Sequence, residues 1–451
     1  MTTVTLVYPY FHPPNDNSIF RLPPLGLGYL AAHLKAHGIS VDLVDCTFMN
    51  QAAALERIRR SKPRIIGISV MFSMKRKAME MARLLRGDCE LLIAGGPLCT
   101  SHPDDFLGDF DVVAMGEGEE TLLELVNAVK NGSSLADVKG IVYREDGEAK
   151  QTQPRGFIQN LDAVAFPARE FFDDAAYMRY YSRNFGYTIT SLMTSRGCPF
   201  SCDFCSRPVF GNVFRSRSAE NVVDEMESVR KLGYGRIWFA DDCFTLDRRR
   251  LIGICDEILK RGLRIGWECL SRADTVDEQV AEKMRQAGCV RVYFGIESGN
   301  DRVLGLMKKS ISVEQARHAV QVMKNAGIQV GAFFILGYPG ETEETILDTV
   351  RFASSLPLDY LSFTFPYPIP GTPLYERVNK NMRLTDWEEP RNLHLIKHKL
   401  LFASSFSEAK LKFAIVKAMT QFYIRKYLGI WGYKVIGKPF ENLTDMIFRA
   451  L

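Results

Sequence analysis

The chain has 451 residues, a formal net charge of +4, and 46% hydrophobic and 24% charged residues. A chain of this length and composition buries a substantial core and is neither collagen-like nor largely disordered. No stretch approaches the run of about 18 apolar residues that spans a membrane, and the N-terminal residues do not form a secretory signal. We therefore expect a cytoplasmic protein of several globular domains without a transmembrane segment.

The first 135 residues alternate short apolar runs with amphipathic segments of helical length. We expect helices at 25–37 and 75–86, and strands at 4–10, 41–46, 65–70, 91–96 and 112–117. Strands buried on both faces and separated by helices form a parallel sheet, which binds ligands at the C-terminal ends of its strands. The pattern predicts an α/β domain with a Rossmann-like parallel sheet. Its Gly-, Pro- and Ser-rich turns are either ligand-binding loops or ordinary connections.

A second series of strands and helices begins at residue 188, after a less regular segment, 136–187, that we interpret as a connector. We expect strands at 188–195, 236–241, 264–270, 290–298, 329–337 and 360–367. Six evenly spaced units of this kind predict a partial (β/α)6 barrel over 188–384. Residues 385–451 are expected to be helical.

The C-terminal 61 residues are strongly basic. Residues 391–451 carry eleven Lys or Arg and three Asp or Glu, a net charge of +8, whereas the whole chain has too little charge to predict nucleic-acid binding. With Phe422, Tyr423, Trp431 and Tyr433, this segment is expected to face a sizeable substrate and to hold its anionic groups. The lysines singled out for that role are Lys410, Lys412 and Lys417. A membrane surface or simple core packing fits the same composition.

Ten cysteines in a chain without a secretion signal indicate metal or redox chemistry rather than disulfides. Three of them, Cys198, Cys202 and Cys205, follow the first strand of the second series with the spacing CxxxCxxC. A 4Fe–4S cluster uses one thiolate per iron, so three cysteines leave one iron open to another ligand. A structural zinc site would need a fourth ligand, and the nearest histidines in sequence are His102 and His318. The other seven, expected mostly to be small buried apolar residues, are Cys46, Cys89, Cys99, Cys243, Cys255, Cys269 and Cys289.

The loop at 196–205 resembles the cluster loop of the radical S-adenosylmethionine (SAM) enzymes, with Phe204 as the aromatic residue before the last cysteine. The resemblance implies a 4Fe–4S cluster on the three cysteines and SAM chelated at the open iron. One electron then cleaves SAM to a 5′-deoxyadenosyl radical. Taken alone, Arg272 and Glu297 could equally form ion pairs at the barrel mouth. The SAM contacts that the resemblance implies are Phe204, Ala240, Asp241, Asp242, Arg272, Glu297 and Gly337.

Residues 1–135 and 368–375 are similar to the subgroup that carries a cobalamin-binding domain before the barrel, so the resemblance covers roughly 1–380. The Asp-x-His-x-x-Gly motif that supplies a histidine to cobalt in many cobalamin proteins is absent. We therefore expect either cobalamin without a protein histidine ligand or a domain that has lost the corrinoid. The implied cobalamin contacts are Tyr8, Leu25, Gly26, Ser69, Val70, Met71, Phe72, Gly95, Gly96, Pro97, Gly116, Glu117 and Gly118.

The resemblance implies a cobalamin-dependent radical SAM C-methyltransferase. The methyl group would pass from SAM through methylcobalamin to an unactivated carbon radical, with electrons from a ferredoxin- or flavodoxin-type donor. The substrate is predicted to be a protein or peptide residue, such as a glutamine of methyl-coenzyme M reductase, or an acidic small molecule. The main alternative is a cyclase, oxidase or rearranging enzyme acting on a lipid, tetrapyrrole or other metabolite. A tRNA methylthiotransferase and a non-catalytic corrinoid or iron–sulfur carrier fit less well.

Overall fold

A computed structural model describes residues 4–11, 18–207, 209–383 and 399–451. Within these ranges the chain forms two compact units. Unit 1 comprises residues up to 199 together with 207–237, and unit 2 comprises 200–206 and the residues from 238 onward. The division of the chain into four domains expected above stays a prediction.

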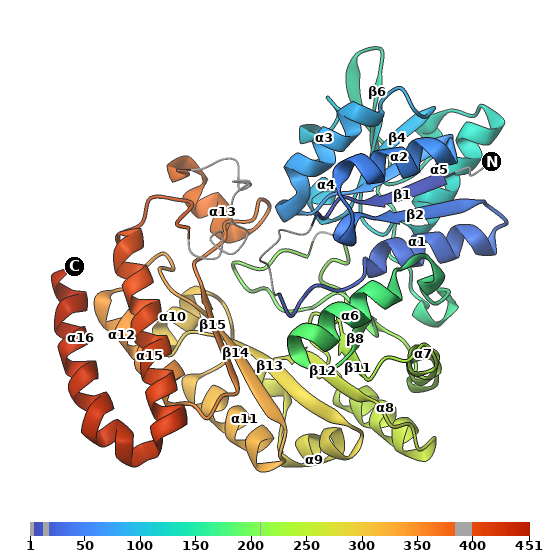
Figure 1. The fold of residues 1–451 in the computed structure, drawn as a ribbon. Coiled ribbons are helices and arrows are strands. Elements are labelled where there is room, and N and C mark those ends of the chain that lie inside the picture. Colours follow the sequence, from blue (N-terminus) through green and yellow to red (C-terminus); the bar gives the residue numbers. More distant parts are fainter. Residues whose placement is uncertain (1–3, 12–17, 208, 384–398) are drawn as a thin grey trace. The chain divides into compact units, whose positions relative to one another are not determined.

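A seven-stranded sheet organises the N-terminal part of unit 1 (Figure 1). Its strand order is β2-β1-β3-β4-β5-β6-β7, and β1 to β5 are parallel, which confirms the expected parallel α/β sheet. The order reverses between β1 and β3, the point at which such sheets bind ligands outside the strand ends. The strands are β1 Val4–Tyr8, β2 Val41–Asp45, β3 Ile65–Ser69, β4 Leu91–Gly95, β5 Val112–Ala114, β6 Ile141–Glu145 and β7 Glu148–Gln151.

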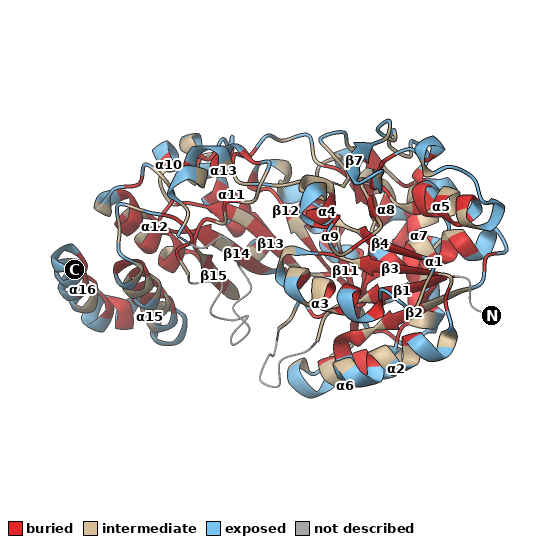
Figure 2. Ribbon diagram, turned by 90° about the horizontal axis from the view of Figure 1, so that it is seen from above, coloured by how far each residue is buried: buried red, intermediate tan, exposed pale blue. Residues whose placement is uncertain are grey.

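Helices cover both faces of this sheet because alternate residues of each strand are apolar on opposite sides. Val4 and Leu6 of β1 join a buried cluster with α1 (Leu25–Ala36) and α5 (Glu119–Asn131). Val7 of the same strand joins a second cluster on the other face, with α2 (Gln51–Ser61), α3 (Lys75–Leu85) and α4 (Pro97–Ser101). The central strands β1, β3 and β4 are accordingly mostly buried (Figure 2), whereas the edge strand β7 is exposed.

The segment interpreted as a connector contributes structure of its own. Strands β6 and β7 pair antiparallel and extend the first sheet beyond β5. The helix α6 (Asp174–Phe185) follows and ends at Gly186. A two-stranded antiparallel ladder then joins β9 (Ser195–Arg196) to β10 (Arg215–Ser216) across the cysteine loop.

A six-stranded sheet has its strands in chain order, β8-β11-β12-β13-β14-β15, as expected for a partial barrel. The pairs from β12 to β15 are parallel. The strands are β8 Ile189–Leu192, β11 Arg236–Phe239, β12 Gly266–Ser271, β13 Cys289–Glu297, β14 Gln329–Ile335 and β15 Tyr360–Thr364. The helices are α7 Ala219–Lys231, α8 Arg248–Lys260, α9 Glu278–Gln286, α10 Asp301–Leu306, α11 Val313–Asn325 and α12 Glu343–Ser355.

The helices of this second series begin at side chains that satisfy their first amide groups. Ser218, Asp247, Asp277, Ser312 and Thr342 each accept a hydrogen bond from the third backbone amide of the helix that follows. Such caps stabilise a helix by about 1 kcal/mol relative to alanine. Local sequence therefore fixes where each helix starts.

The C-terminal part of unit 2 contains α13 (Pro373–Val378), α15 (Glu408–Gly432), a π-helical turn (Tyr433–Gly437) and α16 (Lys438–Ala450). Figure 1 shows α15 and α16 as an antiparallel pair, with α15 against α12. A backbone kink lies at Gly429. The expected helical structure between 385 and 398 lies outside the described residues. In the described part of the chain, no helix is both long enough and apolar enough to cross a bilayer.

The predicted substrate-binding role of two C-terminal lysines is wrong. Lys410 is buried and ion-paired with Glu343, and Lys417 is buried 2.6 Å from Asp445. Lys417 also donates to the carbonyl of Glu441 and to Thr444, at 3.1 and 2.8 Å. A buried ammonium group needs these partners, so both lysines hold helices together rather than face a substrate.

Candidate functional site

The ends of β3 and β4 are joined by backbone contacts. The amide of Val70 donates to the carbonyl of Gly95 at 2.7 Å, and the amide of Leu98 donates to the carbonyl of Val70 at 3.3 Å. Gly96 has φ +112°, and a Cβ atom there would lie 3.0 Å from the Val70 oxygen. Only glycine allows this approach, so the structure brings together two loops that were predicted to bind the same ligand.

The remaining residues of the predicted cobalamin set lie around the same strand ends or on α1. Tyr8 ends β1 and lies beside Tyr10, with ring centroids 6.1 Å apart. Gly116 follows β5, and its amide donates to Thr100 Oγ1 of α4 at 3.0 Å. The buried members include Leu25 and Val70, and the half-buried members are Tyr8, Ser69, Phe72, Gly95, Gly96, Gly116 and Gly118. Gly26, Met71 and Pro97 are exposed.

Glu117, another member of that set, lies in a buried ion-pair network within unit 1. Its carboxylate is 2.6 Å from Arg196 of β9 and 2.8 Å from Arg215 of β10. It also accepts from the amide of Ile158 at 2.7 Å. Glu119 is a second partner of Arg196, at 2.6 Å. The Glu117 side chain is thus committed to holding the β9–β10 ladder.

The two arginines of this network are cross-strand partners in the β9–β10 ladder. Like charges directly opposite each other destabilise a strand pair, and burial adds a desolvation cost. Burial lowers the pKa of Arg196, but the carboxylates of Glu119 and Glu117 outweigh burial and raise it. The carboxylates are therefore what allows these strands to pair. This role of Glu119, Arg196 and Arg215 was not predicted from the sequence.

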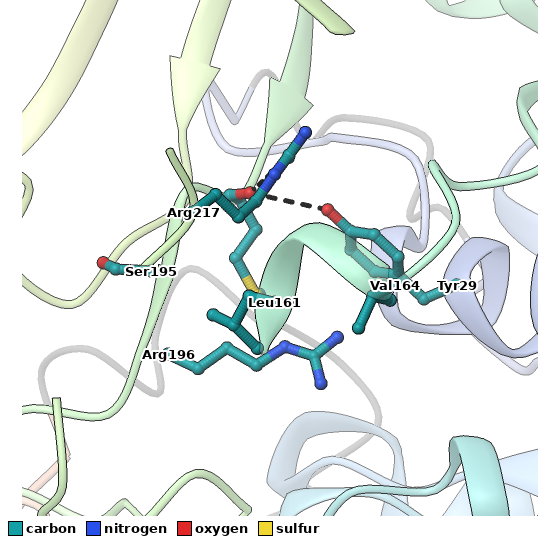
Figure 3. Close-up of a pocket in the computed structure, with 7 residues that line it drawn as sticks. Tyr29, Leu161, Val164, Ser195, Arg196 and Arg217 are labelled. Carbon is teal, nitrogen blue, oxygen red and sulfur yellow. Dashed lines mark hydrogen bonds between the residues drawn. The ribbon is translucent and has the colours of Figure 1, made fainter. Parts of the chain in front are cut away.

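A second buried carboxylate, Glu225 of α7, binds Arg169 at 2.7 Å and Arg217 at 2.5 Å. Arg217 also donates to the carbonyl of Met193 at 2.8 Å, towards which the Tyr29 hydroxyl points (Figure 3). A small pocket lies here, between Arg217 and Arg196. It is lined by Tyr29, Leu161, Val164, Met193, Ser195, Arg196 and Arg217.

Cys198 is held in unit 1 by the backbone that follows β9. Gly197 has φ +83°, and a Cβ atom there would lie 2.3 Å from the carbonyl oxygen of Val213. The amide of Cys198 donates to the carbonyl of Gly211 at 3.4 Å, and Arg207 donates to the carbonyl of Cys198 at 2.6 Å. No other residue fits at Gly197 without moving this backbone, so glycine sets the direction in which the chain enters the cysteine loop.

Cys202 and Cys205 belong to unit 2, where Asp203 between them is the anchor. Its backbone amide donates to the carbonyl of Met307 at 2.9 Å, and its own carbonyl accepts from the amide of Leu374 at 3.0 Å. Its carboxylate accepts hydrogen bonds from Tyr338 and Arg377. Asp203 was not predicted as an anchor, although a carboxylate inside an otherwise apolar Cys-Asp-Phe-Cys run indicates a buried partner.

Phe204 and Arg272, both predicted SAM contacts, lie against this part of the loop. The Phe204 ring meets Tyr338 edge-on, with centroids 6.5 Å apart. Arg272 stacks on Phe200 at 3.6 Å and lies 4.0 Å from the sulfur of Cys202. Asp274 neutralises Arg272 at 2.9 Å. The Arg272 guanidinium, held by Asp274, therefore lies beside the Cys202 sulfur.

Glu297, at the end of β13, pairs with Lys309 at 3.2 Å, and both side chains are buried. A Cβ atom at Gly295 would lie 2.5 Å from the Glu297 carboxylate, so that glycine makes room for the ion pair. Glu297 itself has φ +71°, a strained conformation for a residue with a side chain. Glu297 was predicted at this strand end, whereas its partner Lys309 was not predicted.

The other predicted SAM contacts lie at the ends of β11 and β14. After β11, Ala240 is half-buried, Asp241 is buried 3.6 Å from Arg250, and Asp242 is exposed. After β14, the amide of Gly337 donates to the buried carboxyl group of Glu341 at 2.7 Å. The structure therefore gathers Phe204 and Arg272 at the cysteine loop, whereas the other members occupy separate strand ends.

The thiols divide into two kinds that fit different roles. All ten cysteines are free, and burial raises the pKa values of Cys46, Cys99, Cys255, Cys269 and Cys289, which keeps those thiols protonated. Cys198 is half-buried and Cys205 is exposed, so neither is part of the apolar core. The described residues contain no group of three or more Cys, His, Asp or Glu gathered as a metal site. The assignment of cluster ligands therefore rests on spacing and on how the loop is held.

Comparison with known proteins identifies two domains. Residues 192–353 match the Radical SAM superfamily, and residues 15–126 match the B12 binding domain. The chain is 34% identical to an uncharacterized methyltransferase of Pyrococcus horikoshii, over 97% of this chain and 96% of that protein. It is 30% identical to an anaerobic magnesium-protoporphyrin IX monomethyl ester cyclase of Rubrivivax gelatinosus, over 86% of this chain and 72% of that one.

Solved structures share the fold. The cobalamin-dependent SAM radical enzyme OxsB, solved with aqua-cobalamin and SAM bound, gives a TM-score of 0.76 at 21% identity, over 99% of this chain and 72% of that chain. The radical SAM methyltransferase TsrM of Kitasatospora setae, solved with cobalamin and a 4Fe–4S cluster, gives a TM-score of 0.71 at 21% identity. That match covers 84% of this chain and 75% of TsrM.

Replacement of Glu117 by Gln should lower the free energy of unfolding by about 3–5 kcal/mol, because it leaves Arg215 buried without a carboxylate partner. Urea denaturation of the purified protein measures the loss. Glu145→Gln is the matched control, since Glu145 pairs with Lys150 on the surface and its removal should cost less than about 1 kcal/mol. Equal effects of the two substitutions would contradict the structural role of Glu117.

Glu341 should make stability fall as the pH rises. Burial raises the pKa of Glu341 to about 8, although the amides of Tyr338 and Gly337 oppose this shift. The pKa of Glu341 is higher in the folded state than in the unfolded state, so protonation of Glu341 stabilises the fold. This stabilisation is complete below about pH 4.5 and is lost as the pH approaches 8, by up to about 1.4 kcal/mol per pH unit. Thermal or urea unfolding between pH 5 and 8 should show wild type losing stability relative to Glu341→Gln.

Glu344→Gln is the control for that measurement. Glu344 is exposed in the first turn of α12, three residues after Glu341, and pairs with Arg449, which holds the pKa of Glu344 below its usual value. Glu344 therefore titrates at lower pH than Glu341, and the difference between wild type and this variant should change little from pH 5 to 8. A constant difference for Glu341→Gln as well would show that Glu341 does not titrate in this range.

Proposed function

This chain belongs to the cobalamin-dependent methyltransferase family of the radical SAM superfamily, and we propose that it transfers a methyl group from SAM to an unactivated carbon of its substrate. Its cofactors are a 4Fe–4S cluster, SAM and cobalamin. The observation that carries the proposal is the presence of both domains in one chain that is 34% identical to a methyltransferase along 97% of its length. A carbon that is not a nucleophile cannot accept a methyl group by direct displacement from SAM, so both domains are needed.

We assign the cluster to Cys198, Cys202 and Cys205. When bound, the cofactors supply an electron for SAM cleavage and a carrier for the methyl group. The chain fixes the loop by the Gly197 turn and the backbone contacts of Asp203. Arg272 approaches the Cys202 sulfur to 4.0 Å and stacks on Phe200 of the same loop, which helps to hold the loop. These contacts favour a cluster at this loop over a disulfide or a buried, inert thiol.

SAM would be held by side chains and backbone at the strand ends of unit 2. We assign its contacts to Phe204, Ala240, Asp241, Asp242, Arg272, Glu297 and Gly337. Glu297 uses Oε1 for Lys309, which leaves Oε2 to accept from a polar group of SAM. Arg272 contributes its positive charge and its stacked face beside Cys202. These are the SAM contacts expected from the strand ends. Lys309 is added as a residue that positions Glu297.

Cobalamin would bind at the C-terminal edge of the first sheet, where the strand order reverses between β1 and β3. The two glycines at the end of β4, Gly95 and Gly96, allow a large ring to approach the backbone there. We assign contacts to the residue set given under Sequence analysis, with Glu117 acting only through its backbone because its carboxylate is engaged. The missing Asp-x-His-x-x-Gly motif supports a cobalt without a protein histidine.

The nature of the substrate is the least constrained part of the proposal. A protein or peptide residue, such as a glutamine of methyl-coenzyme M reductase, stays a prediction that none of the relatives above supports. Lys410 and Lys417 are buried in ion pairs and do not face a substrate's anionic groups. The electron donor, of the ferredoxin or flavodoxin type, likewise stays a prediction.

The products of turnover test the reaction. Anaerobic incubation with SAM carrying a deuterated methyl group, cobalamin and a reductant should give 5′-deoxyadenosine, S-adenosylhomocysteine and a deuterium-labelled product. Untargeted mass spectrometry of an extract from cells lacking the gene identifies that product. Formation of 5′-deoxyadenosine and a modified but unlabelled product, without S-adenosylhomocysteine, would instead establish a cyclase, oxidase or rearranging activity.

Replacement of Cys198, Cys202 or Cys205 by Ala should abolish the iron-dependent absorbance and the cleavage of SAM, because each thiolate holds one iron. Absorbance spectroscopy and quantification of 5′-deoxyadenosine provide the two measurements. Cys269→Ala is the control, since that thiol is fully buried and protonated and should affect neither. An equal loss of both signals in the control would refute the ligand assignment.

A further inference from the structure

Exposed apolar side chains are concentrated at the C-terminal end of unit 2. Of the eighteen large hydrophobic residues that are exposed in the described chain, eleven lie between 416 and 451. Isolated exposed apolar residues are normal, but a concentration of them marks an interaction surface. The concentration is densest where α15 meets α16.

Five of these residues form what we call the helical turn surface: Tyr427, Leu428, Trp431, Val435 and Ile436. The ring of Trp431 is 78% exposed and that of Tyr427 is 74% exposed. They lie within ten consecutive residues, around the Gly429 kink and the π-helical turn that join the two helices (Figure 1). Chain connectivity therefore keeps them together at the end of the helical pair.

The opposite sides of the two helices already provide the packing that holds the pair. Leu411, Ala414, Ala418 and Phe422 of α15 are buried, as is Phe448 of α16. Lys417 links the helices through Asp445 at 2.6 Å. The helical turn surface is therefore not required for the core. Its exposure of apolar side chains to water is unfavourable and adds no packing contact.

Positive charge surrounds this surface. Between Phe422 and Glu441 the sequence contains Arg425, Lys426, Lys434 and Lys438 and no Asp or Glu. Lys426, Lys434 and Lys438 are exposed beside the five apolar residues. The same charge would repel a second copy of the surface, so self-association through it is unfavourable. A partner that complements the helical turn surface therefore offers both negative charge and an apolar region.

We propose that the helical turn surface docks on an anionic lipid bilayer. Trp and Tyr side chains settle at the boundary between headgroups and acyl chains, and lysines beside them bind lipid phosphates. Leu428, Val435 and Ile436 supply the apolar area that enters the boundary. A bilayer fits better than an acidic protein because apolar side chains presented outward from a helical turn need no matching pocket in a fluid interface. The inference is independent of the proposed reaction.

Flotation of the holoenzyme with lipid vesicles tests the proposal. Wild type should float with vesicles of phosphatidylglycerol and phosphatidylcholine but not with vesicles of phosphatidylcholine alone, and binding should weaken at high salt. The double variant Lys434→Glu with Val435→Ser should lose at least about tenfold in apparent partition coefficient, because it reverses one charge and removes one apolar contact. Both side chains are exposed, so the fold should be retained, as circular dichroism will check.

Lys231→Glu with Leu232→Ser is the matched control, since it alters an adjacent, exposed Lys and apolar pair at the end of α7. It should bind anionic vesicles as wild type does. The proposal is overturned if wild type does not float with anionic vesicles, or if the two double variants bind equally. It is also overturned if analytical ultracentrifugation without lipid shows a dimer that Lys434→Glu with Val435→Ser dissociates, because the occupant is then a second copy.

Discussion

The buried ion pairs of Glu117 with Arg196 and Arg215 are the interaction on which the arrangement of unit 1 depends. The two guanidinium groups lie on directly paired strands, and each is buried among aromatic rings, with Arg196 5.4 Å from the Tyr29 ring and 5.2 Å from the Phe210 ring. Without a carboxylate between them, the strands would bring two like charges together in a medium of low dielectric constant. A hydrophobic replacement of the whole group could be equally stable, but it would not fix one register. The network therefore specifies geometry more than it adds stability.

The ion-pair network of Glu117 matters because it lies next to the cysteine loop in the chain. Arg196 is followed directly by Gly197 and Cys198. The network therefore orients β9, the strand that leads into the first cysteine of the loop. Glu117 and Glu119 begin the connection from β5 to α5 in the B12 binding domain. Side chains from one matched domain thus hold the backbone at the start of the other. A substitution in the first domain can disturb the cysteine loop without touching a cofactor.

Much of the fold could be predicted from the sequence because each buried strand is a short apolar run. Strand starts were accurate, whereas some ends were placed too late. The strand expected at 112–117 ends at Ala114, because Gly116 has φ +74° and begins the turn. The strand expected at 188–195 is divided into β8 and β9. Strands β6 and β7 extend the first sheet because their antiparallel pairing needs only a tight turn at Asp146 and Gly147, both with positive φ.

The candidate site was predictable only where its residues are close in sequence. The three cysteines fall within eight residues, so spacing alone identified them. The partners that hold the site are distant in sequence: Glu117 and Arg196 are 79 residues apart, and Arg377 and Asp203 are 174 apart. Nothing in a local pattern pairs such residues. The same limit explains Lys410 and Lys417, whose positive charge was visible but whose buried partners, Glu343 and Asp445, were not.

The three glycines Gly26, Gly28 and Gly197 lack side chains for different reasons. At Gly197 and Gly28 a Cβ atom would collide with the protein itself, with the Val213 carbonyl in one case and Phe172 in the other. At Gly26 no described atom lies within 4 Å of the space that a Cβ would fill, although glycine in a helix is less favourable than alanine by about 0.5–1 kcal/mol. A library selected for thermostability alone should therefore replace Gly26 and keep the other two. What such a library gains at Gly26 measures the stability that glycine costs this helix at a position where the fold leaves room for a side chain.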